Sequence, residues 1–237
     1  MKRLVALLLV LALAALCMPA LSEGDEDSSV GLVFSGVSSP YMEEGGVPSS
    51  TEFFTDADFA ASRITIVNLW DSSCLFCRLE LPYFQQISVE FSDSGVGCLG
   101  AVTTVMGGSY PAAYQYLQEF GVTYPNVIPD DRFNETLFNV SGTPQTFLVN
   151  SDGEIVAHHR GSMTYEELYE LLTGEMRVPG DADCDGEITF ADISRAYIYL
   201  TGGAELTAMG AVNADFNGDG AVSFGDISAL YIYVIGG

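Results

Sequence analysis

Two cysteines separated by two residues, Cys74 and Cys77, are the side chains of this sequence best suited to covalent chemistry. An apolar, β-branched run at 64–69 precedes them, and residues 75–91 carry apolar side chains at helical spacing, so the pair lies where a buried strand becomes a helix. The unpaired N–H groups and the dipole of a helix N-terminus favour an anion, and therefore the thiolate form of a cysteine placed there. Cys74 is predicted to be a reactive thiolate.

Strand and helix patterns alternate on both sides of the cysteine pair, which is typical of an α/β domain. An apolar share of 48% is sufficient to build its core. In chain order the patterns predict a strand at 64–69, a helix at 74–91, a strand at 96–105, a helix at 111–120, a short strand at 124–128, a helical piece at 131–138, strands at 146–149 and 154–158 joined by a turn, and a helix capped by Thr164 and Glu167.

Four motifs within this alternating region resemble one known family. Residues 51–176 resemble the thioredoxin fold, an α/β fold with a central mixed sheet flanked by helices, and within it the extracytoplasmic thiol-disulfide oxidoreductases of the TlpA and ResA type. The motifs that carry the resemblance are Val67-Asn68-Leu69-Trp70, Cys74-x-x-Cys77-Arg78-x-Glu80-Leu81-Pro82, Gly142-Thr143-Pro144-x-Thr146-Phe147-Leu148-Val149 and Asp152-Gly153-Glu154-Ile155-Val156.

The resemblance implies roles for three residues at the start of the predicted helix. Cys74 would attack a substrate disulfide, and Cys77 would resolve the mixed disulfide that results. Glu80 matches an acidic residue that the family uses near its cysteines; the alternative is an ordinary solvated carboxylate on the helix. No organic cofactor is implied.

Three further residues belong to the substrate side of the predicted site. In the family Pro144 follows a cis peptide bond, and the backbone of Thr143 then lies beside the cysteines and holds an extended substrate. Trp70 is expected to pack beside the site.

The sequence departs from the family around the first cysteine. Ser72-Ser73 replace a common tryptophan, and Leu75-Phe76 replace the usual proline-containing pair. The intervening dipeptide helps to set the redox potential, so the direction of electron transfer stays open. The apolar Leu75-Phe76 pair supports the hypothesis of protein substrates.

Other cysteines and the histidines have simpler interpretations. Cys98 lies in an apolar strand and is predicted to be a buried thiol, whereas Cys184 lies in a loop and is predicted to be an exposed one. His158 and His159 are adjacent on a predicted strand and point to opposite faces, which disfavours joint metal binding. They are interpreted as core or surface imidazoles.

The N-terminus has the pattern of a signal peptide. Lys2 and Arg3 precede an apolar run from Leu4 to Leu16, and Ala20-Leu21-Ser22 fits the small-x-small rule for cleavage, so residues 1–22 are predicted to be removed. The apolar run is shorter than the roughly 20 residues that span a bilayer. The mature protein is therefore expected to be secreted, with no stable membrane insertion. Lipid attachment at Cys17 is the alternative.

The charge of the sequence is strongly acidic, with 32 acidic residues against eight basic ones. This balance disfavours nucleic acid and anionic membranes as partners. Part of the acidity lies in residues 23–50, which are interpreted as a flexible leader or linker that contains an edge hairpin.

After Pro179-Gly180 the alternating pattern ends and a repeated acidic segment begins. Both copies offer side-chain oxygens at loop positions 1, 3, 5, 9 and 12, a backbone carbonyl at position 7 and glycine at position 6, which is a calcium-binding pattern. The predicted ligands of two structural Ca²⁺ ions are Asp181, Asp183, Asp185, Glu187, Thr189 and Asp192 in the first copy, and Asp215, Asn217, Asp219, Ala221, Ser223 and Asp226 in the second. The alternative is a pair of acidic surface turns without metal.

Residues 177–237 resemble a type I dockerin, a small all-α domain with two EF-hand-like calcium loops. Position 12 is Asp instead of the Glu of ordinary EF-hands, and no convincing helix precedes either loop. The resemblance implies binding to a cohesin domain of a scaffoldin. The residues that would contact the cohesin stand at loop positions 10 and 11, namely Phe190, Ala191, Phe224 and Gly225.

The predicted protein is a secreted thiol-disulfide oxidoreductase, tethered by its dockerin to a cellulosome-like complex or to a bacterial cell surface. Its substrate would be a protein disulfide or dithiol, and a separate redox partner is implied. The alternative is a noncatalytic component whose thioredoxin fold serves as a spacer or binding module. No catalytic module is left over for carbohydrate degradation.

Overall fold

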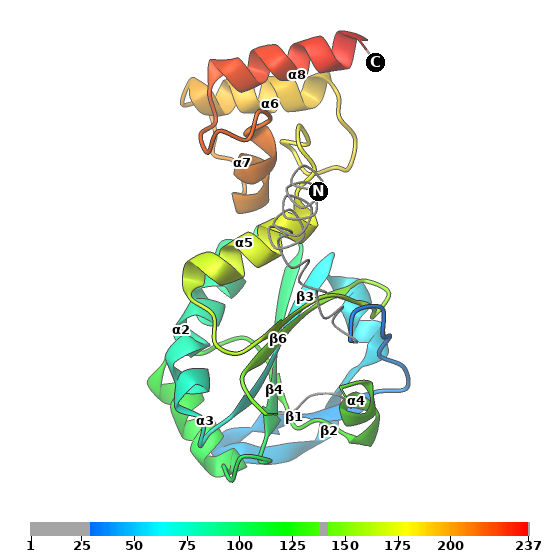
Figure 1. Ribbon diagram of the computed structural model, residues 1–237, viewed down its shortest axis with the longest axis vertical. Helices are drawn as coiled ribbons and strands as arrows, with labels where there is room; N and C mark the ends of the chain where they lie inside the picture. Colours follow the sequence, from blue (N-terminus) through cyan, green and yellow to red (C-terminus); the bar gives the residue numbers. More distant parts are fainter. Residues whose placement is uncertain (1–28, 138–141, 237) are drawn as a thin grey trace, which may run out of the picture.

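A mixed β-sheet forms the centre of the computed structural model, which describes residues 29–137 and 142–236 (Figure 1). The sheet has seven strands in the order β2-β1-β5-β4-β3-β6-β7 within these residues. The strands are β1 (Ser38–Glu43), β2 (Val47–Thr55), β3 (Ile64–Asp71), β4 (Val96–Thr103), β5 (Asn126–Val127), β6 (Gln145–Asn150) and β7 (Ile155–Arg160). The predicted α/β fold with a mixed central sheet is confirmed.

Strand β3 is parallel to β4 and antiparallel to β6, and all of its residues are buried. Its side chains alternate between two apolar clusters, because successive side chains of a strand point to opposite faces of the sheet. Ile64 and Ile66 pack with Phe84 of α2 (Leu75–Glu90), whereas Val67 packs with Phe133 of α4 (Asp131–Thr136). Helices thus cover both faces of β3.

The helices of this region lie close to their predicted positions. Helix α3 covers Tyr110–Glu119, and α5 covers Tyr165–Met176 with the predicted capping box between Thr164 and Glu167. Short 3₁₀ turns complete the connections in the part of the chain that the structure describes: η1 (Glu44–Gly46), η2 (Asp56–Ala61) and η3 (Ser92–Ser94).

The predicted flexible leader is wrong for its second half. Strands β1 and β2 form an antiparallel hairpin, and β1 also pairs with β5, so the hairpin belongs to the main sheet. Phe34 and Val37, which precede the hairpin, are each only 2% exposed. The expected edge hairpin is confirmed, but β2 runs across the predicted boundary at residue 50. The predicted signal peptide and Cys17 lie outside the described residues.

The C-terminal region consists of helices joined by loops. Helices α6 (Phe190–Leu200) and α8 (Phe224–Gly236) contact each other and lie side by side at one end of the molecule (Figure 1). Helix α7 (Ala208–Ala214), which the sequence patterns did not predict, lies between them and α5. It ends directly before Asp215, so the expectation that no helix precedes the second loop is wrong. Among the described residues, no helix combines the length and apolar character needed to cross a membrane.

Helix α7 packs the C-terminal region against the sheet domain. Met209 is completely buried in the cluster that contains Phe91 and Leu172, and its N–H donates to the Ser94 hydroxyl at 3.2 Å. Phe91 follows the C-terminus of α2, whereas Cys74 precedes its N-terminus. Sixteen helical residues separate these ends by about 24 Å. The C-terminal region therefore lies at the opposite end of α2 from the cysteines.

The Met209 contact predicts a stability effect. Met209→Ala should lower the free energy of unfolding by about 2–5 kcal/mol, because it leaves a cavity between α7 and the sheet domain. Met106→Ala is the matched control, since Met106 is 54% exposed, and it should change stability by less than about 0.5 kcal/mol. Urea unfolding followed by circular dichroism measures both. Equal effects of the two substitutions would contradict the contact.

Candidate active site

The two cysteines form a disulfide at the N-terminus of α2. Cys74 is the N-cap residue, and the backbone N–H of Cys77 points at its sulfur at 3.2 Å. Cys77 is completely buried, while Cys74 remains partly accessible. The N–H of Cys77, in the first helical turn, thus faces the more accessible sulfur, which is an arrangement that stabilises a thiolate.

The backbone at Thr143 and Pro144, just before β6, lies beside the cysteine pair. The carbonyl oxygen of Thr143 lies 3.6 Å from the Cys74 sulfur. The peptide bond between Thr143 and Pro144 is cis, as the family resemblance implied. The structure therefore brings together the predicted reactive cysteine and the predicted substrate-holding backbone, which are far apart in sequence.

Glu80 lies one turn beyond Cys77 on α2 and is only 1% exposed, so the alternative of a solvated carboxylate is wrong. Its Oε2 accepts a hydrogen bond from the N–H of Met163 at 3.1 Å, and its Oε1 has no partner among the described residues. Burial raises the pKa of Glu80 to about 8, although the bond from Met163 opposes the shift. A cavity of about 300 Å³ beside it is lined by Phe76, Leu79, Glu80, Tyr83, Ser162, Met163, Thr164 and Glu167.

Trp70 lies below the site and does not face a substrate. It is completely buried and packs with Cys77 and Leu81. Its indole N–H donates to the side-chain oxygen of Asn126 at 3.1 Å. Trp70 therefore packs beside the site, as expected, and its complete burial means that it supports the cysteine loop from inside and does not contact a substrate.

Asp71 is a residue of the site that the motifs did not single out. It is completely buried, and its carboxylate accepts hydrogen bonds from the N–H of Ser73 at 2.8 Å and the N–H of Met106 at 2.9 Å. Ser72 adds a bond from its hydroxyl to the carbonyl of Ser109 at 3.0 Å. Asp followed by Ser is a turn-forming signal, which could have identified this loop. The departure at Ser72-Ser73 thus ties the cysteine loop to residues 106–109.

An apolar surface flanks the cysteine loop. Leu75 is 55% exposed and Phe76 is 61% exposed, although both are large apolar side chains at the start of α2. Exposed apolar side chains that gather at one site are typical of contact with a partner. The loop held by Asp71 adds two more, Val105 and Met106.

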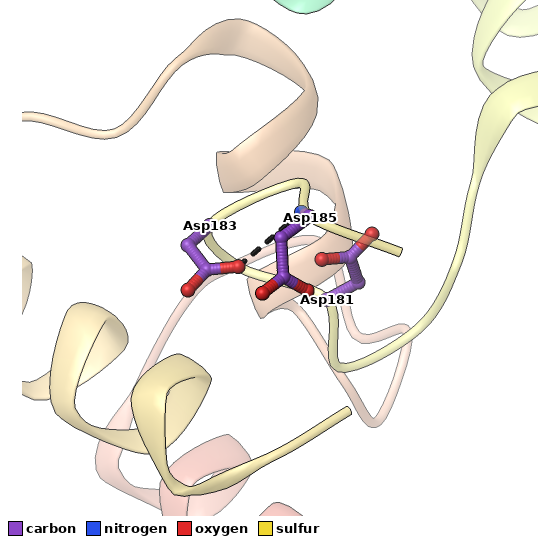
Figure 2. Close-up of side chains that lie close together, drawn as sticks. All are labelled: Asp181, Asp183 and Asp185. Carbon is purple, nitrogen blue, oxygen red and sulfur yellow. Dashed lines mark hydrogen bonds between the residues drawn. The ribbon is translucent and has the colours of Figure 1, made fainter. Parts of the chain in front are cut away.

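The first acidic loop brings three predicted calcium ligands together. Carboxylate oxygens of Asp181, Asp183 and Asp185 all lie within 4.8 Å of one another (Figure 2). Asp181 is completely buried, and its Oδ1 has no partner among the described residues. Desolvation, followed by the charge of Asp192, raises the pKa of Asp183. Clustered carboxylates with an unpaired buried oxygen fit a hard divalent cation.

Both loops end in the same hydrogen-bond pattern. The carboxylates of Asp192 and Asp226 are buried at the starts of α6 and α8. Each accepts bonds from the backbone N–H groups at loop positions 3 and 9, which belong to Asp183, Thr189, Asn217 and Ser223. The remaining predicted ligands of these loops, Glu187, Asp215, Asp219 and Ala221, occupy the intervening turns.

The second loop differs from the first in its polar contacts. Asp215 accepts hydrogen bonds from the backbone N–H groups of Asp219 and Gly220 at 3.1 and 2.9 Å. The amide of Asn217 donates to Asp219 at 3.0 Å. Because the Asp215 oxygens already accept internal bonds, the unpaired buried oxygen that marks the first loop is specific to that loop within the described residues.

The predicted partner-contacting residues lie on the surface of the two long C-terminal helices. Phe190 and Phe224 are 56% and 58% exposed, and Ala191 and Gly225 beside them are also exposed. Phe190 contacts Tyr231 edge to face, and Tyr197 contacts Phe224 in the same way. The sequence repeat thus produces two equivalent aromatic contacts between α6 and α8.

The other cysteines lie apart from the redox pair. Cys98 is buried in β4, and burial raises the pKa of its thiol far above the usual range. Cys184, predicted to be exposed, is half-buried and packs with residues of the sheet domain. Its φ of +62° places a side chain in the left-handed region, where the equivalent residue of the second loop is Gly218. Neither forms a disulfide.

Comparison with known proteins supports the fold and relates the chain to thiol-disulfide enzymes. No protein-family model matches the chain. The thiol-disulfide oxidoreductase ResA of Bacillus subtilis is 30% identical over 106 residues, which cover 45% of this chain and 58% of ResA. The thiol:disulfide interchange protein HelX of Rhodobacter capsulatus is 30% identical over 121 residues, which cover 50% of this chain and 64% of HelX. The chain thus spans less than two thirds of either relative.

A solved structure agrees with the observed topology. The solution structure of a protein described as a thioredoxin from Neisseria meningitidis superposes with a TM-score of 0.50 at 18% identity, and the match covers 61% of this chain and 90% of that protein. The domain around the mixed sheet is therefore a thioredoxin-like fold.

The burial of Glu80 predicts a dependence of stability on pH. Above its ordinary pKa of 4.5 the unfolded state loses the Glu80 proton, whereas the folded state keeps it up to about pH 8. The free energy of unfolding therefore decreases as the pH rises from about 4.5 to about 8, by at most about 1.4 kcal/mol per pH unit from this group. Glu80→Gln should remove this slope.

Urea unfolding at a series of pH values measures the slope. Glu119→Gln, at an exposed position on α3, is the matched control and should keep the wild-type slope. A Glu80→Gln protein whose stability follows the wild-type pH dependence would contradict the buried-carboxyl assignment.

Proposed function

We propose that this protein is a thiol-disulfide oxidoreductase whose reactive group is the Cys74 sulfur. The observation that carries the proposal is the position of this sulfur, at the start of α2 and 3.6 Å from the Thr143 carbonyl. The partly accessible Cys74 is the attacking residue, and the buried Cys77 is the resolving one. The names of the relatives ResA and HelX support the same chemistry.

The reaction needs two exchanges of sulfur bonds. The Cys74 thiolate attacks one sulfur of a substrate disulfide, so a mixed disulfide forms and the other substrate sulfur leaves as a thiolate. Cys77 then passes its proton to a neighbouring base and its thiolate attacks the Cys74 sulfur. The Cys74–Cys77 disulfide forms, and the second substrate sulfur leaves as a thiolate that takes a proton from water. The reverse sequence oxidises a substrate dithiol.

Glu80 is suited to exchange a proton with Cys77. Its carboxyl is buried on the same helix, three residues from Cys77, and its raised pKa of about 8 is close to that of an ordinary thiol. An acid and a base with similar pKa values transfer a proton at little cost. The substrate is a protein disulfide or dithiol, because extended backbone can pair at Thr143 and the surface at Leu75 and Phe76 is apolar.

We further propose that residues 177–237 act as a calcium-dependent dockerin that binds a cohesin domain. Two observations favour this: the clustered carboxylates of the first loop, and the equivalent exposed aromatic pairs on α6 and α8. Two Ca²⁺ ions, held by the predicted residues of each loop, would neutralise the clustered charge. The oxidoreductase would then be secreted and tethered at a cell surface or in a cellulosome-like complex.

The redox proposal predicts that wild-type protein accelerates the reduction of insulin by dithiothreitol and that Cys74→Ser abolishes the acceleration, since the attacking sulfur is lost. Cys184→Ser is the matched control, because its thiol lies apart from the site, and it should keep the wild-type rate. Turbidity of the insulin B chain measures the rate. If wild type and Cys74→Ser are equally inactive, the fold serves as a noncatalytic spacer or binding module.

The calcium proposal predicts that the full chain binds about two Ca²⁺ ions in titration calorimetry. Asp192→Ala and Asp226→Ala should each lose about one ion, whereas Asp152→Ala, in an exposed turn, should bind as wild type does. Calcium should also raise the thermal stability, because metal binding favours the folded state. Absence of any calcium heat would leave the acidic surface turns as the correct interpretation.

A further inference from the structure

A chain of hydrogen bonds leads from the loop beside Cys74 into the sheet. Gln145, the first residue of β6, is only 3% exposed. Its side-chain N–H donates to the carbonyl of Gly142 at 2.8 Å, and its Oε1 lies 2.7 Å from Nε2 of His158. Both ends of this buried amide are therefore occupied.

The direction of each bond follows from the groups that take part. The Gly142 carbonyl can only accept, so the Gln145 amide nitrogen faces it and Oε1 faces the imidazole. His158 must then carry a proton on Nε2. In the neutral ring Nδ1 accepts from the hydroxyl of Ser29, which lies 2.6 Å away and is 2% exposed.

The surroundings of His158 hold its ring in one orientation. The ring stacks on Phe147, its cross-strand neighbour on β6, with the centroids 4.2 Å apart and the planes 13° from parallel. Phe147 is completely buried. An imidazole held by a stacked ring on its face and by hydrogen bonds at its edges provides a rigid acceptor and donor for Gln145.

The position of the Gly142 carbonyl affects the position of the Thr143 backbone that follows it. Gly142 has a φ of +92°. Glycine adopts this left-handed conformation readily, because its backbone is the least restricted of all residues. The bond from Gln145 restrains this peptide, and the next carbonyl along the chain is that of Thr143, 3.6 Å from the Cys74 sulfur. Movement at Gly142 would therefore reach the backbone beside the reactive sulfur.

We propose that Gln145 and His158 are positioning residues, which orient the backbone of Thr143 for the binding of an extended protein substrate. The proposal rests on the thiol-disulfide activity proposed above and adds the part of the sheet that prepares the loop. The interpretation of His158 as an ordinary core imidazole explains its stacking on Phe147. It does not explain why His158 belongs to a series of hydrogen bonds that runs through Gln145 and Gly142 and ends beside Cys74.

The experiment compares kinetic constants for insulin with the rate on a small disulfide. Gln145→Leu removes both amide bonds at similar volume, and His158→Phe keeps the ring stacking without its hydrogen bonds. Each should raise KM for insulin about fivefold, the effect of one net hydrogen bond, and leave kcat within about twofold. Reaction of the reduced protein with 5,5′-dithiobis(2-nitrobenzoate) should keep the wild-type rate, because this reagent needs no backbone pairing.

Two further variants separate positioning from a general effect on folding. His158→Gln can still donate to Gln145, and it should return KM to within about twofold of wild type. His159→Phe, on the opposite face of the same strand, is the matched control and should change neither constant. A purely structural role would lower the melting temperature of the variants without separating KM from kcat.

The outcomes distinguish this inference from the redox proposal. An active wild type whose KM is unchanged by Gln145→Leu and His158→Phe would overturn the positioning role alone. The same follows if the rate on the small disulfide falls with the rate on insulin. A wild type no more active than Cys74→Ser would overturn both. If Gln145→Leu does not fold, His158→Phe and His158→Gln still decide the question.

Discussion

The burial of β3 on both faces is the constraint on which the rest of the structure depends. Because no residue of this strand is exposed, its hydrogen bonds to β4 and β6 and its alternating side chains permit one register. The strand ends at Asp71, and α2 begins within four residues. The cysteine pair therefore emerges at a fixed point, and the antiparallel neighbour β6 brings the Thr143 carbonyl to the same edge.

Buried carboxyl groups give this framework its chemical character, although each costs free energy to bury. Asp71 offsets the cost with hydrogen bonds that hold residues 106–109 against the cysteine loop. Glu80 has fewer bonds, so desolvation raises its pKa. Asp181 keeps one oxygen unpaired, as a cation ligand would require. The same physical cost thus accompanies the loop that Asp71 restrains, the raised pKa of Glu80 and the carboxylate cluster of the proposed calcium site.

The C-terminal region and the redox site use opposite ends of α2. Met209 packs α7 against the C-terminal end of that helix, while Phe190 on α6 and Phe224 on α8 stay more than half exposed. A partner bound at Phe190 or Phe224 would therefore leave Cys74 accessible. The separation of the two sites is compatible with the tethering that we propose.

Local patterns in the sequence determined what depends on neighbouring residues alone. The Cys74-x-x-Cys77 pair, the start of α2, the capping box at Thr164 and the two acidic loops all follow from spacing and turn chemistry. Tertiary structure decided what depends on packing between distant residues. This includes the burial of Glu80, the inclusion of the β1–β2 hairpin in the sheet and the packing of Met209 against the sheet domain. It also includes the hydrogen bonds that link His158 through Gln145 to Gly142. These features need partners that are remote in sequence, and a pattern along one chain does not specify which remote residues will meet.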